Sequence, residues 1–394
     1  MNYQVIEKNF AVPCRHRVYF TNDSFDSESD FLKSLLRSVE DESPTQVLVV
    51  MDEGALTSRP QLEAEIESYF SARPELFQWR GIQVYPGGEL LKNNLQYLSK
   101  LYAEVEAAKL CRHSCLIAVG GGALLDMVGL VAATAHRGIR HVRFPTTSLS
   151  QADGGVGVKN GINYLGKKNF IGSFAVPHAV VNDHRFVESL PQQQFMEGAV
   201  EAIKVALIRN GALFEAIEAK ADLLKQRDAE TSAWLIQASA REHVEHIVEG
   251  GDPFETTTAR PLDFGHWVAH KLESMSGFRI SHGEAVAMGM AVDVLYSQRM
   301  GFLTERIAER ILALIERLGF TLYASELSEL NSQGGSKIIE GLEEFREHLG
   351  GRLTITLLRG IGASFEVHEM DAAVVLDCIE TLRERHTGET QTAG

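Results

Sequence analysis

The feature that most constrains the fold is a buried apolar strand that runs directly into three consecutive glycines. Cys115–Val119 is the apolar run, Gly120, Gly121 and Gly122 follow it, and Ala123–Ala135 has the composition of a helix. A strand, a glycine-rich turn and a helix in this order indicate an open α/β sheet. Such a turn lets backbone N–H groups approach a phosphate at a helix N-terminus. Because the spacing is not G-x-G-x-x-G, a simple tight turn stays open as the alternative.

The rest of the first half alternates between strands and helices. Gln46–Met51 is a second apolar run and ends at Asp52, whose carboxylate is suited to accept from a ribose hydroxyl. Leu90–Ala108 has helical periodicity, and His141–Phe144 is a further strand. The sequence therefore predicts an α/β domain of the dinucleotide-binding, Rossmann-like kind over residues 1–190.

The second half is predicted to be helical, over residues 191–385, with one late apolar run, Leu353–Leu358, as a candidate strand. The tail, 386–394, is rich in threonine, glycine and glutamate and is predicted to be disordered. The predicted helices are Gln192–Asn210, Ala212–Glu249, Phe264–Ser276, Glu284–Met300, Thr304–Leu318 and Ala372–Glu384.

Composition excludes several classes of function. The net charge of the 394 residues is −15, which argues against a nucleic-acid partner because phosphate backbones need a basic face. The N-terminus lacks the pattern of a signal peptide, and no uncharged apolar stretch reaches the roughly 20 residues that span a bilayer. The four cysteines form no C-x-x-C motif, which fits a reducing compartment. We therefore expect a cytoplasmic protein that binds no membrane.

A carboxylate and several histidines have the spacing of a metal site. Glu201 and Lys204 are three residues apart on one helix face, among small apolar neighbours that make a solvated ion pair a weaker interpretation. His266 and His270 are four apart, and His282 follows a short loop. Glu201 with two of these three histidines would give Zn²⁺ three ligands and leave one position open for substrate.

Spacing alone does not settle which histidines bind the metal. Two others, His243 and His246, lie on a predicted helix of the same half.

Taken together, these residues resemble the dehydroquinate synthase family of sugar phosphate cyclases. The resemblance extends from Gln46 to Gly362. It implies an N-terminal NAD domain, an all-α C-terminal domain and an active site between them. The stretches that carry it are Ala118–Asp126, Arg137-Gly138, Phe144–Thr147, Lys159, Gly166–Gly172, Leu190-Pro191, Gly198–Lys204, Phe264–His266, His270 and His282–Met290.

The resemblance also implies cofactors and residue roles. Zn²⁺ or Co²⁺ would bind Glu201, His266 and His282, and Arg137 would reach the active site of a neighbouring subunit, so a homodimer is implied. Substrate contacts are implied for Asp153, Lys159, Asn169, Lys204 and His270. NAD contacts are implied for Asp52, Glu89, Lys92, Gly121, Gly122, Asp126, Thr146, Thr147, Lys168, Phe186, Ser189 and Leu190.

The implied reaction converts a phosphorylated keto-sugar into a carbocycle. NAD oxidises a secondary alcohol transiently, phosphate is eliminated, the hydride is returned, and an intramolecular aldol step closes the ring. The metal polarises the alcohol oxygen, and Lys159, Lys204 and His270 are suited to hold a phosphate dianion. The enzyme would be a carbon–oxygen lyase.

The sequence departs from dehydroquinate synthases where those enzymes bind a substrate carboxylate. Ala259 stands at the position of an arginine, with Arg260 one residue away; Asp263 replaces an asparagine, and a lysine position falls at about Glu245. An acid beside a carboxylate is repulsive, whereas an acid beside a hydroxyl is a good acceptor. The favoured substrate is therefore uncharged at this end, as in sedoheptulose 7-phosphate, and the product a valiolone-type C7 cyclitol, as in the 2-epi-5-epi-valiolone synthase branch.

Three alternatives stay open. The first is a 3-dehydroquinate synthase acting on the carboxylated heptulosonate phosphate, because the His282-Gly283-Glu284 motif is close to those enzymes. The second is a metal-dependent polyol or glycerol dehydrogenase, a class that shares the glycine turn and a helical metal domain. The third is a cyclase fold kept only for binding or regulation, against which the complete set of candidate metal ligands argues.

Overall fold

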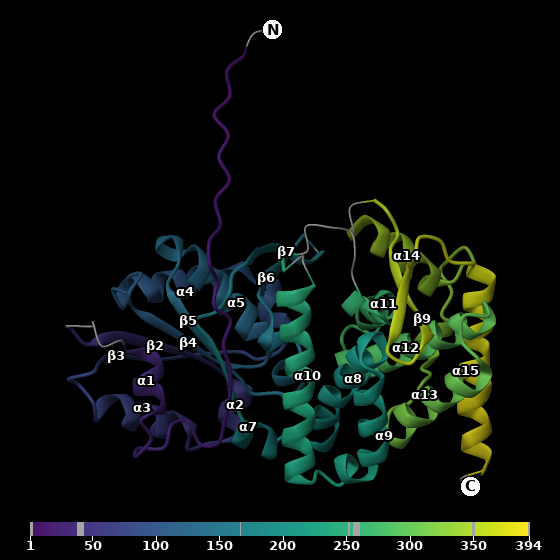
Figure 1. The fold of residues 1–394 in the computed structure, drawn as a ribbon, viewed down its shortest axis with the longest axis horizontal. Coiled ribbons are helices and arrows are strands. Elements are labelled where there is room, and N and C mark those ends of the chain that lie inside the picture. The colour runs from purple at the N-terminus through teal and green to yellow at the C-terminus, as the bar shows by residue number, and fades with distance from the viewer. Residues whose placement is uncertain are drawn as a thin grey trace.

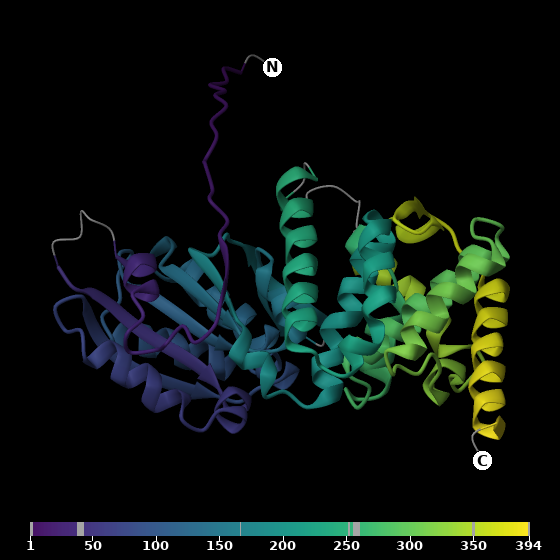
Figure 2. The ribbon, with the colours of Figure 1, turned by 60° about the horizontal axis from the view of Figure 1, so that its bottom comes forward.

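The computed structural model describes residues 3–37, 43–165, 167–250, 253–254, 261–348 and 351–392. Two lobes lie side by side, an α/β lobe formed by the first half of the chain and a mainly helical lobe formed by the second (Figure 1). Helix α10 (Ala229–Glu249) stands between the lobes in both views (Figures 1 and 2) and contacts helix α6 (Ser148–Ala152) of the first lobe and α8 (Gln192–Arg209) of the second.

A six-stranded parallel sheet organises the first lobe, which confirms the predicted α/β fold. Its order is β1-β8-β5-β4-β2-β3. Strands β2 and β4 are neighbours, but the chain continues from β2 to β3 toward one edge of the sheet and from β4 to β5 toward the other edge. In such sheets ligands bind at the carboxyl ends of the strands where the order reverses, which here is the end of β2 and β4. The strands are β1 (Val18–Thr21), β2 (Thr45–Asp52), β3 (Phe77–Tyr85), β4 (Cys115–Gly120), β5 (Arg140–Pro145) and β8 (Ala179–Asp183).

Helices cover both faces of this sheet, and the pleat of β2 explains why its apolar run is continuous. Val47 and Val49 point into the core under α1 and α3, whereas Leu48 and Val50 point into the core under α4 and α5. A strand buried on both faces loses the alternation of an exposed sheet. The helices of this lobe are α1 (Phe31–Leu36), α2 (Glu53–Ser58), α3 (Leu62–Ser71), α4 (Leu95–Ala107), α5 (Gly122–Thr134), α6 and α7 (His184–Glu188), with short 3₁₀ turns η1 (Glu89–Asn93), η2 (Ala135–Arg137) and η3 (Gly154–Val156).

A β-hairpin that the sequence did not predict projects from the first lobe toward the second. It consists of β6 (Lys159–Tyr164) and β7 (Lys167–Phe174), paired antiparallel. The hairpin packs against α5 and η1, near the glycine turn. It thus brings polar residues from a third part of the chain to the edge where the sheet order reverses.

The second lobe is helical with one small sheet, which corrects the expectation of an all-α domain. The late apolar run forms β9 (Ile355–Gly360), and an unpredicted strand, β10 (Ala363–Val367), pairs with it antiparallel. Core residues of this lobe, between positions 187 and 382, form one cluster. The lobe contains α8, α9 (Gly211–Lys225), α10, η4 (Pro261–Asp263), α11 (His266–Met275), α12 (His282–Arg299), α13 (Glu305–Arg317), η5 (Ser325–Ser328), α14 (Lys337–His348) and α15 (Ala372–Thr392).

The single helix predicted over Ala212–Glu249 is two helices. Arg227 has a φ of 58°, which ends α9, and the Asp228 side chain accepts from Thr231 N and caps α10. Asp228 is a preferred N-cap residue type, so the break had a signal in the sequence that periodicity concealed. The predicted boundary at residues 190 and 191 stays a prediction.

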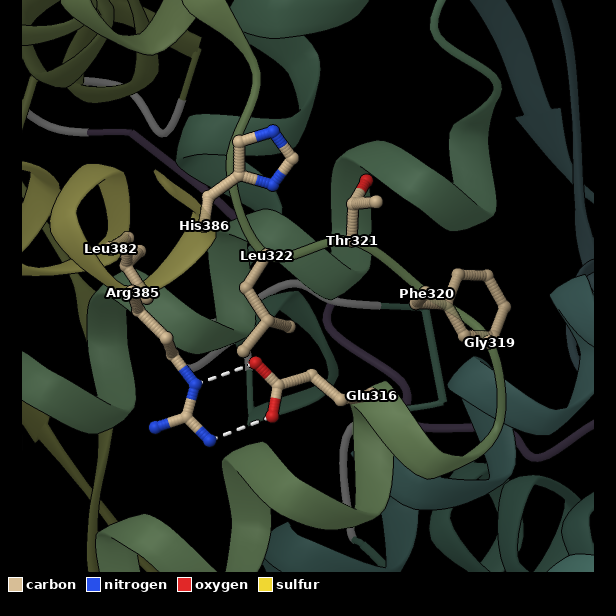
Figure 3. Close-up of a pocket in the computed structure, with 8 residues that line it drawn as sticks. All are labelled: Glu316, Gly319, Phe320, Thr321, Leu322, Leu382, Arg385 and His386. Atoms are coloured by element: carbon tan, nitrogen blue, oxygen red, sulfur yellow. Dashed lines mark hydrogen bonds and ion pairs between the residues drawn. The ribbon is translucent and has the colours of Figure 1, made fainter. Parts of the chain in front are cut away.

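Helix α15 continues to Thr392, and the disorder predicted for residues 386–394 stays a prediction. Arg385 forms ion pairs with Glu316 and Glu309 on α13, and the ring of His386 lies 5.9 Å from that of Tyr323. Figure 3 shows Arg385 joined to Glu316. The ion pairs of Arg385 fix α15 against α13 just before the predicted tail, and residues 393 and 394 lie outside the described ranges.

The pocket drawn in Figure 3 lies between α13 and α15 and has a volume of about 160 Å³. None of the residues predicted to bind a metal, NAD or substrate lines it. In the described parts of the chain, no helix combines the length and apolar composition that a bilayer crossing needs.

Candidate active site

The glycine turn at the end of β4 is fitted closely around Asp52 at the end of β2. The Asp52 carboxylate accepts from Gly121 N at 2.7 Å and from Ala55 N at 2.7 Å. A Cβ on Gly120 would lie 2.5 Å from Asp52 Oδ2 and 2.6 Å from Leu124 Cδ2, so this position requires glycine for close approach. Burial is the main cause of the raised pKa of Asp52.

Two threonines at the end of β5 lie beside the same turn. Thr146 N donates to Gly120 O at 3.0 Å, and the Thr147 side chain caps α6 in a capping box with Ser150. A Cβ on Gly121 would lie 3.6 Å from Thr147 Cγ2. The structure thus brings four of the predicted NAD residues, Asp52, Gly121, Thr146 and Thr147, to one corner of the sheet.

Another three predicted NAD residues lie at the end of α7. Phe186 and Leu190 are buried, and Ser189 Oγ donates to Phe186 O at 3.3 Å. Phe186 belongs to the core of the first lobe and Leu190 to that of the second. Their roles in binding NAD stay predictions.

A polar cluster joins the start of α5 to the β6–β7 hairpin. Lys92 Nζ donates to Asp126 Oδ2 at 2.8 Å and contacts Asn169 Oδ1, although the Lys92 side chain is only 5% exposed. Asn169 has a φ of 52°, and its N–H donates to Asn163 Oδ1 at 2.8 Å. Asn163 also donates to Glu89 Oε1 at 2.8 Å. Sequence reasoning missed Asn163, which fixes the backbone of a predicted substrate residue, because one asparagine in a strand has no distinctive signal.

Glu201, His266 and His282 form the candidate metal centre. Each offers one ligand atom, and these atoms lie within 4.8 Å of one another. The Glu201 side chain is completely buried on α8, and His282 Nε2 lies 3.6 Å from Glu201 Oε1. His270, one turn after His266, lies with its ring 5.5 Å from that of His266 and outside this group. Within the described residues, the geometry therefore favours His266 and His282 as the two histidine ligands, a choice that sequence spacing alone did not settle.

Two glycines bring the histidines together. Gly265 starts α11 with a φ of 78°, and a Cβ there would lie 2.7 Å from Met290 N on α12. A Cβ on Gly289 would lie 2.0 Å from Gly265 O. Close contact between the two helices thus places His266, at the start of α11, beside His282, at the start of α12.

Both imidazoles are oriented by acceptors at Nδ1, so that Nε2 faces the centre. His266 Nδ1 lies 3.1 Å from Phe264 O, and His282 Nδ1 lies 3.3 Å from Glu273 Oε1. Burial holds the pKa of His266 well below its usual value, which favours the neutral imidazole that metals bind. Burial alone would lower the pKa of His282, but Glu201 and Glu273 outweigh it and raise that pKa to about 10.

The side chains fit a divalent cation. Lys204 Nζ lies 2.5 Å from Oε2 of the buried Glu201 carboxylate, whereas Oε1 has no hydrogen-bond partner in the described residues and faces His282 Nε2 at 3.6 Å. An anionic oxygen buried without such a partner is costly unless a cation satisfies it. One carboxylate and two imidazoles are ligands that Zn²⁺ prefers, and a high pKa for a histidine between two carboxylates is relieved when a metal replaces its proton.

Asp153 and His243 extend the metal centre toward α10. Lys204 Nζ donates to Asp153 Oδ2 at 3.1 Å, and His243 Nε2 lies 3.1 Å from Asp153 Oδ1. Burial alone would raise the pKa of Asp153, but His243 and Lys204 hold it well below its usual range. Conversely, Asp153 outweighs burial and raises the pKa of His243.

His243, rather than Glu245, faces this cluster from α10. His243 is 2% exposed, whereas Glu245 is only half-buried on the same helix. The signal that identifies His243 is the buried stripe of α10, in which Ile236, Ser239 and Ala240 precede it at helical spacing.

The remaining predicted substrate residues surround these groups less closely. Lys159 is exposed at the start of β6, His270 is half-buried on α11, and Asp263 lies in η4, which packs against α8. Ala259, Arg260 and Gly166 lie outside the described residues. Of these three residues, His270 is in contact with a metal ligand, since its ring lies 5.5 Å from that of His266.

Arg137 lies beyond the C-terminal end of α5, away from the glycine turn. It follows α5, whose N-terminus is at the glycine turn and whose 13 residues span about 20 Å. Arg137 is exposed, and both Arg137 and the preceding His136 have a positive φ, 61° and 52° respectively. Its role in a neighbouring subunit's site stays a prediction.

Two family models match the chain consecutively. Residues 82–197 match the 3-dehydroquinate synthase N-terminal model, and residues 198–334 match the C-terminal model. A 3-dehydroquinate synthase of Halorhodospira halophila is 34% identical over 74% of this chain and 80% of the relative. The chain belongs to the 3-dehydroquinate synthase family. It is therefore a sugar phosphate cyclase of that family, as the sequence resemblance implied.

Members with other names are similarly close. A 2-epi-5-epi-valiolone synthase of Streptomyces glaucescens is 32% identical over 78% of this chain and 77% of the relative. The solved structure of the 2-epi-5-epi-valiolone synthase ValA of Streptomyces hygroscopicus subsp. jinggangensis, with NAD⁺ and Zn²⁺ bound, superposes with a TM-score of 0.82 at 24% identity and covers 96% of this chain and 100% of that one. The likeness to the ValA structure establishes the fold of this chain. The sequence identities to the 3-dehydroquinate synthase and to the 2-epi-5-epi-valiolone synthase are too similar to identify its substrate.

Proposed function

We propose that this family member converts a phosphorylated ketose without a carboxylate, with sedoheptulose 7-phosphate as the favoured substrate, into a valiolone-type C7 cyclitol. The reaction would use bound NAD and a divalent metal, Zn²⁺ or Co²⁺, and release phosphate, so the enzyme is a carbon–oxygen lyase. Glu201, His266 and His282 would hold the metal. Asp52, Gly121, Thr146 and Thr147 would contact NAD, together with Gly122 and the residues at the start of α5.

The observation that carries the substrate assignment is the acid at Asp263, which lies in η4 against α8, the helix that bears Glu201 and Lys204. An acid at this position would repel a substrate carboxylate, whereas it can accept a hydrogen bond from a hydroxyl. The ion pairs of Lys204 with Asp153 and Glu201 are implied for the whole family and do not separate the two substrates. Ala259 and Asp263, which stand where the resemblance puts an arginine and an asparagine in dehydroquinate synthases, support the same conclusion.

Bound NAD would accept and return the hydride, and the bound metal would polarise the substrate oxygen. Asp153 is placed to accept a proton or hydrogen bond from a substrate hydroxyl, because Lys204 and His243 keep it ionised. Lys204 is placed to stabilise negative charge on an oxygen near the metal. Lys159, Asn169 and His270 would hold the phosphate by charge-assisted hydrogen bonds.

A direct test measures phosphate release from two substrates in parallel, with NAD and Zn²⁺ or Co²⁺ present. One is sedoheptulose 7-phosphate and the other is the carboxylated heptulosonate phosphate. We expect release from the first at a kcat/KM at least roughly 100-fold above the second, since an unpaired charge beside an acid is strongly rejected. The Glu201→Gln variant should lose this activity, and Lys271→Met, whose lysine pairs with the exposed Glu344 on α14, should keep it.

The alternatives predict other outcomes of the same assay. Release from only the carboxylated substrate would establish a 3-dehydroquinate synthase and refute the argument from charge; the identity to relatives with that name is the observation in its favour. Net NADH formation from a simple polyol would indicate a dehydrogenase. Absence of release from either substrate, with metal and NAD bound, would indicate a different phosphorylated ketose.

We also propose a cytosolic homodimer. All four cysteines are free in the structure, which suits a reducing compartment, and Arg137 is exposed about 20 Å from its own glycine turn. Light scattering would give the mass in solution, and Arg137→Ala should reduce phosphate release without changing NAD or metal binding to its own subunit.

A further inference from the structure

One buried carboxylate connects the candidate metal centre with the hairpin of the first lobe. Glu273 lies on α11, and its side chain is only 7% exposed. Its Oε1 lies 3.3 Å from His282 Nδ1, and its Oε2 accepts from Lys168 Nζ at 3.1 Å. The two partners come from different lobes, since His282 begins α12 and Lys168 lies on β7.

The contact with His282 fixes the ring that would bind the metal. When Nδ1–H donates to Glu273, the other nitrogen, Nε2, faces Glu201 and His266. Carboxylates that accept from a ligating imidazole set its tautomer and orientation, and their loss typically weakens metal binding by about 10- to 100-fold.

The contact with Lys168 continues into the cluster at the start of α5. The neighbour of Lys168 in the hairpin is Asn169, which contacts Lys92, and Lys92 donates to Asp126. The Asn169 backbone is held in its left-handed conformation by Asn163. An unbroken series of contacts therefore leads from Asp126, a predicted NAD residue, to His282, a predicted metal ligand.

We propose that Glu273 is a positioning residue that couples the two cofactors, so that NAD binding raises the affinity of the metal centre. NAD seated at the glycine turn would fix the hairpin, Lys168 would then hold Glu273, and Glu273 would hold His282 in the orientation that binds metal. Coupling between two ligands is reciprocal, so the metal raises the affinity for NAD by the same factor. This inference rests on the proposed metal and NAD sites.

The test is a metal titration against a chromophoric chelator, in the absence of NAD and at saturating NAD. For the unaltered protein we expect NAD to tighten Zn²⁺ binding by roughly 5- to 100-fold, the usual range for coupled sites. Glu273→Gln keeps the size of the side chain but removes its charge, and should weaken Zn²⁺ binding by about 10- to 100-fold and abolish the effect of NAD. Lys168→Met should leave Zn²⁺ binding without NAD within about twofold of normal while abolishing the effect of NAD. Because Lys168 is itself a predicted NAD contact, a separate NAD titration must show that this variant is saturated with NAD in the assay.

Matched controls come from an ion pair that starts on the same helix. Lys271→Met and Glu344→Gln remove a pair that joins α11 to α14, whereas Glu273 joins α11 to His282 and the hairpin, and both control variants should retain the full effect of NAD. The d–d absorption spectrum of bound Co²⁺ gives a second readout, which Glu273→Gln should alter and Glu344→Gln should not. If Glu273→Gln fails to fold, Lys168→Met and Glu273→Asp carry the test, the latter with partial retention of coupling.

The outcomes separate this inference from the proposed function. Normal Zn²⁺ affinity in Glu273→Gln would overturn the positioning role, and an intact NAD effect in Lys168→Met would overturn the coupling route. If the unaltered protein bound no Zn²⁺ at all, the proposed metal centre itself would be wrong. Tight Zn²⁺ binding that NAD does not change would leave the proposed function standing and refute only the coupling.

Discussion

Replacing Lys204 with methionine should destabilise the metal-free protein strongly and the metal-loaded protein much less. Lys204 Nζ lies 3.1 Å from Asp153 Oδ2 and 2.5 Å from Glu201 Oε2, and its side chain is 2% exposed. Methionine fills a similar volume but leaves the two carboxylates without this cation. His243 still faces Asp153 at 3.1 Å, whereas Glu201 is left with the His282 ring, whose Nε2 lies 3.6 Å from Glu201 Oε1.

The magnitude follows from the cost of a buried charge that has lost its partner. Breaking a buried pair on one side costs about 3–5 kcal/mol. A lobe of about 190 residues changes its Tm by about 2–4 °C per kcal/mol, so Tm of the second lobe should fall by roughly 6–20 °C without metal. In Lys204→Met, bound Zn²⁺ would neutralise Glu201 and would no longer be repelled by the lysine. Zn²⁺ should therefore restore roughly half of the lost stability.

The assay is thermal unfolding followed by circular dichroism, with EDTA or with saturating Zn²⁺. Lys271→Met serves as the control, because its partner Glu344 is 61% exposed and such pairs contribute about 1 kcal/mol or less. A Tm of metal-free Lys204→Met equal to that of the control would refute the reasoning. An equal decrease in Tm with and without Zn²⁺ would also refute it, since the metal would then not neutralise the Glu201 carboxylate.

Three further predictions concern other parts of the molecule. Gly120→Ala should lower the free energy of unfolding in urea by about 1–3 kcal/mol, because its Cβ would lie 2.5 Å from Asp52 Oδ2. Gly122→Ala, whose Cβ would have nothing within 4 Å, should keep its stability and weaken NAD binding in a fluorescence titration. Equal losses of stability in the two variants would contradict the clash at Gly120. Burial raises the pKa of Asp293 from 3.8 to about 7, so the folded state binds this proton more tightly than the unfolded chain does. The free energy of unfolding should therefore decrease as pH rises from about 4 to 7. Asp293→Asn should flatten this pH dependence in unfolding monitored by the fluorescence of Trp267, whose indole donates to Asp293. His243→Gln should lower the rate of phosphate release while leaving the Zn²⁺ dissociation constant within about twofold, and a large loss of Zn²⁺ would place His243 among the metal ligands instead.

The sequence by itself determined the elements that depend on local pattern. The run from Cys115 through the glycines specified a buried strand, a tight turn and a helix, and Gln46–Met51 specified its neighbour in the sheet. Apolar continuity of this kind requires cover on both faces, which leaves few alternatives to a parallel α/β sheet. The motifs around Glu201, His266 and His282 had the residue types of a metal site, and their family resemblance was confirmed.

Only the tertiary structure decided which polar residues meet. Glu273, His243 and Asn163 had no distinctive motif, and each acquires its role from a partner far along the chain: Lys168, Asp153 and Glu89. The end of α15 is likewise fixed by ion pairs of Arg385 with Glu316 and Glu309 on α13. Sequence periodicity reports which face of an element is buried, but a buried polar group is specified by the partner that satisfies it, and that partner is chosen by how the lobes pack.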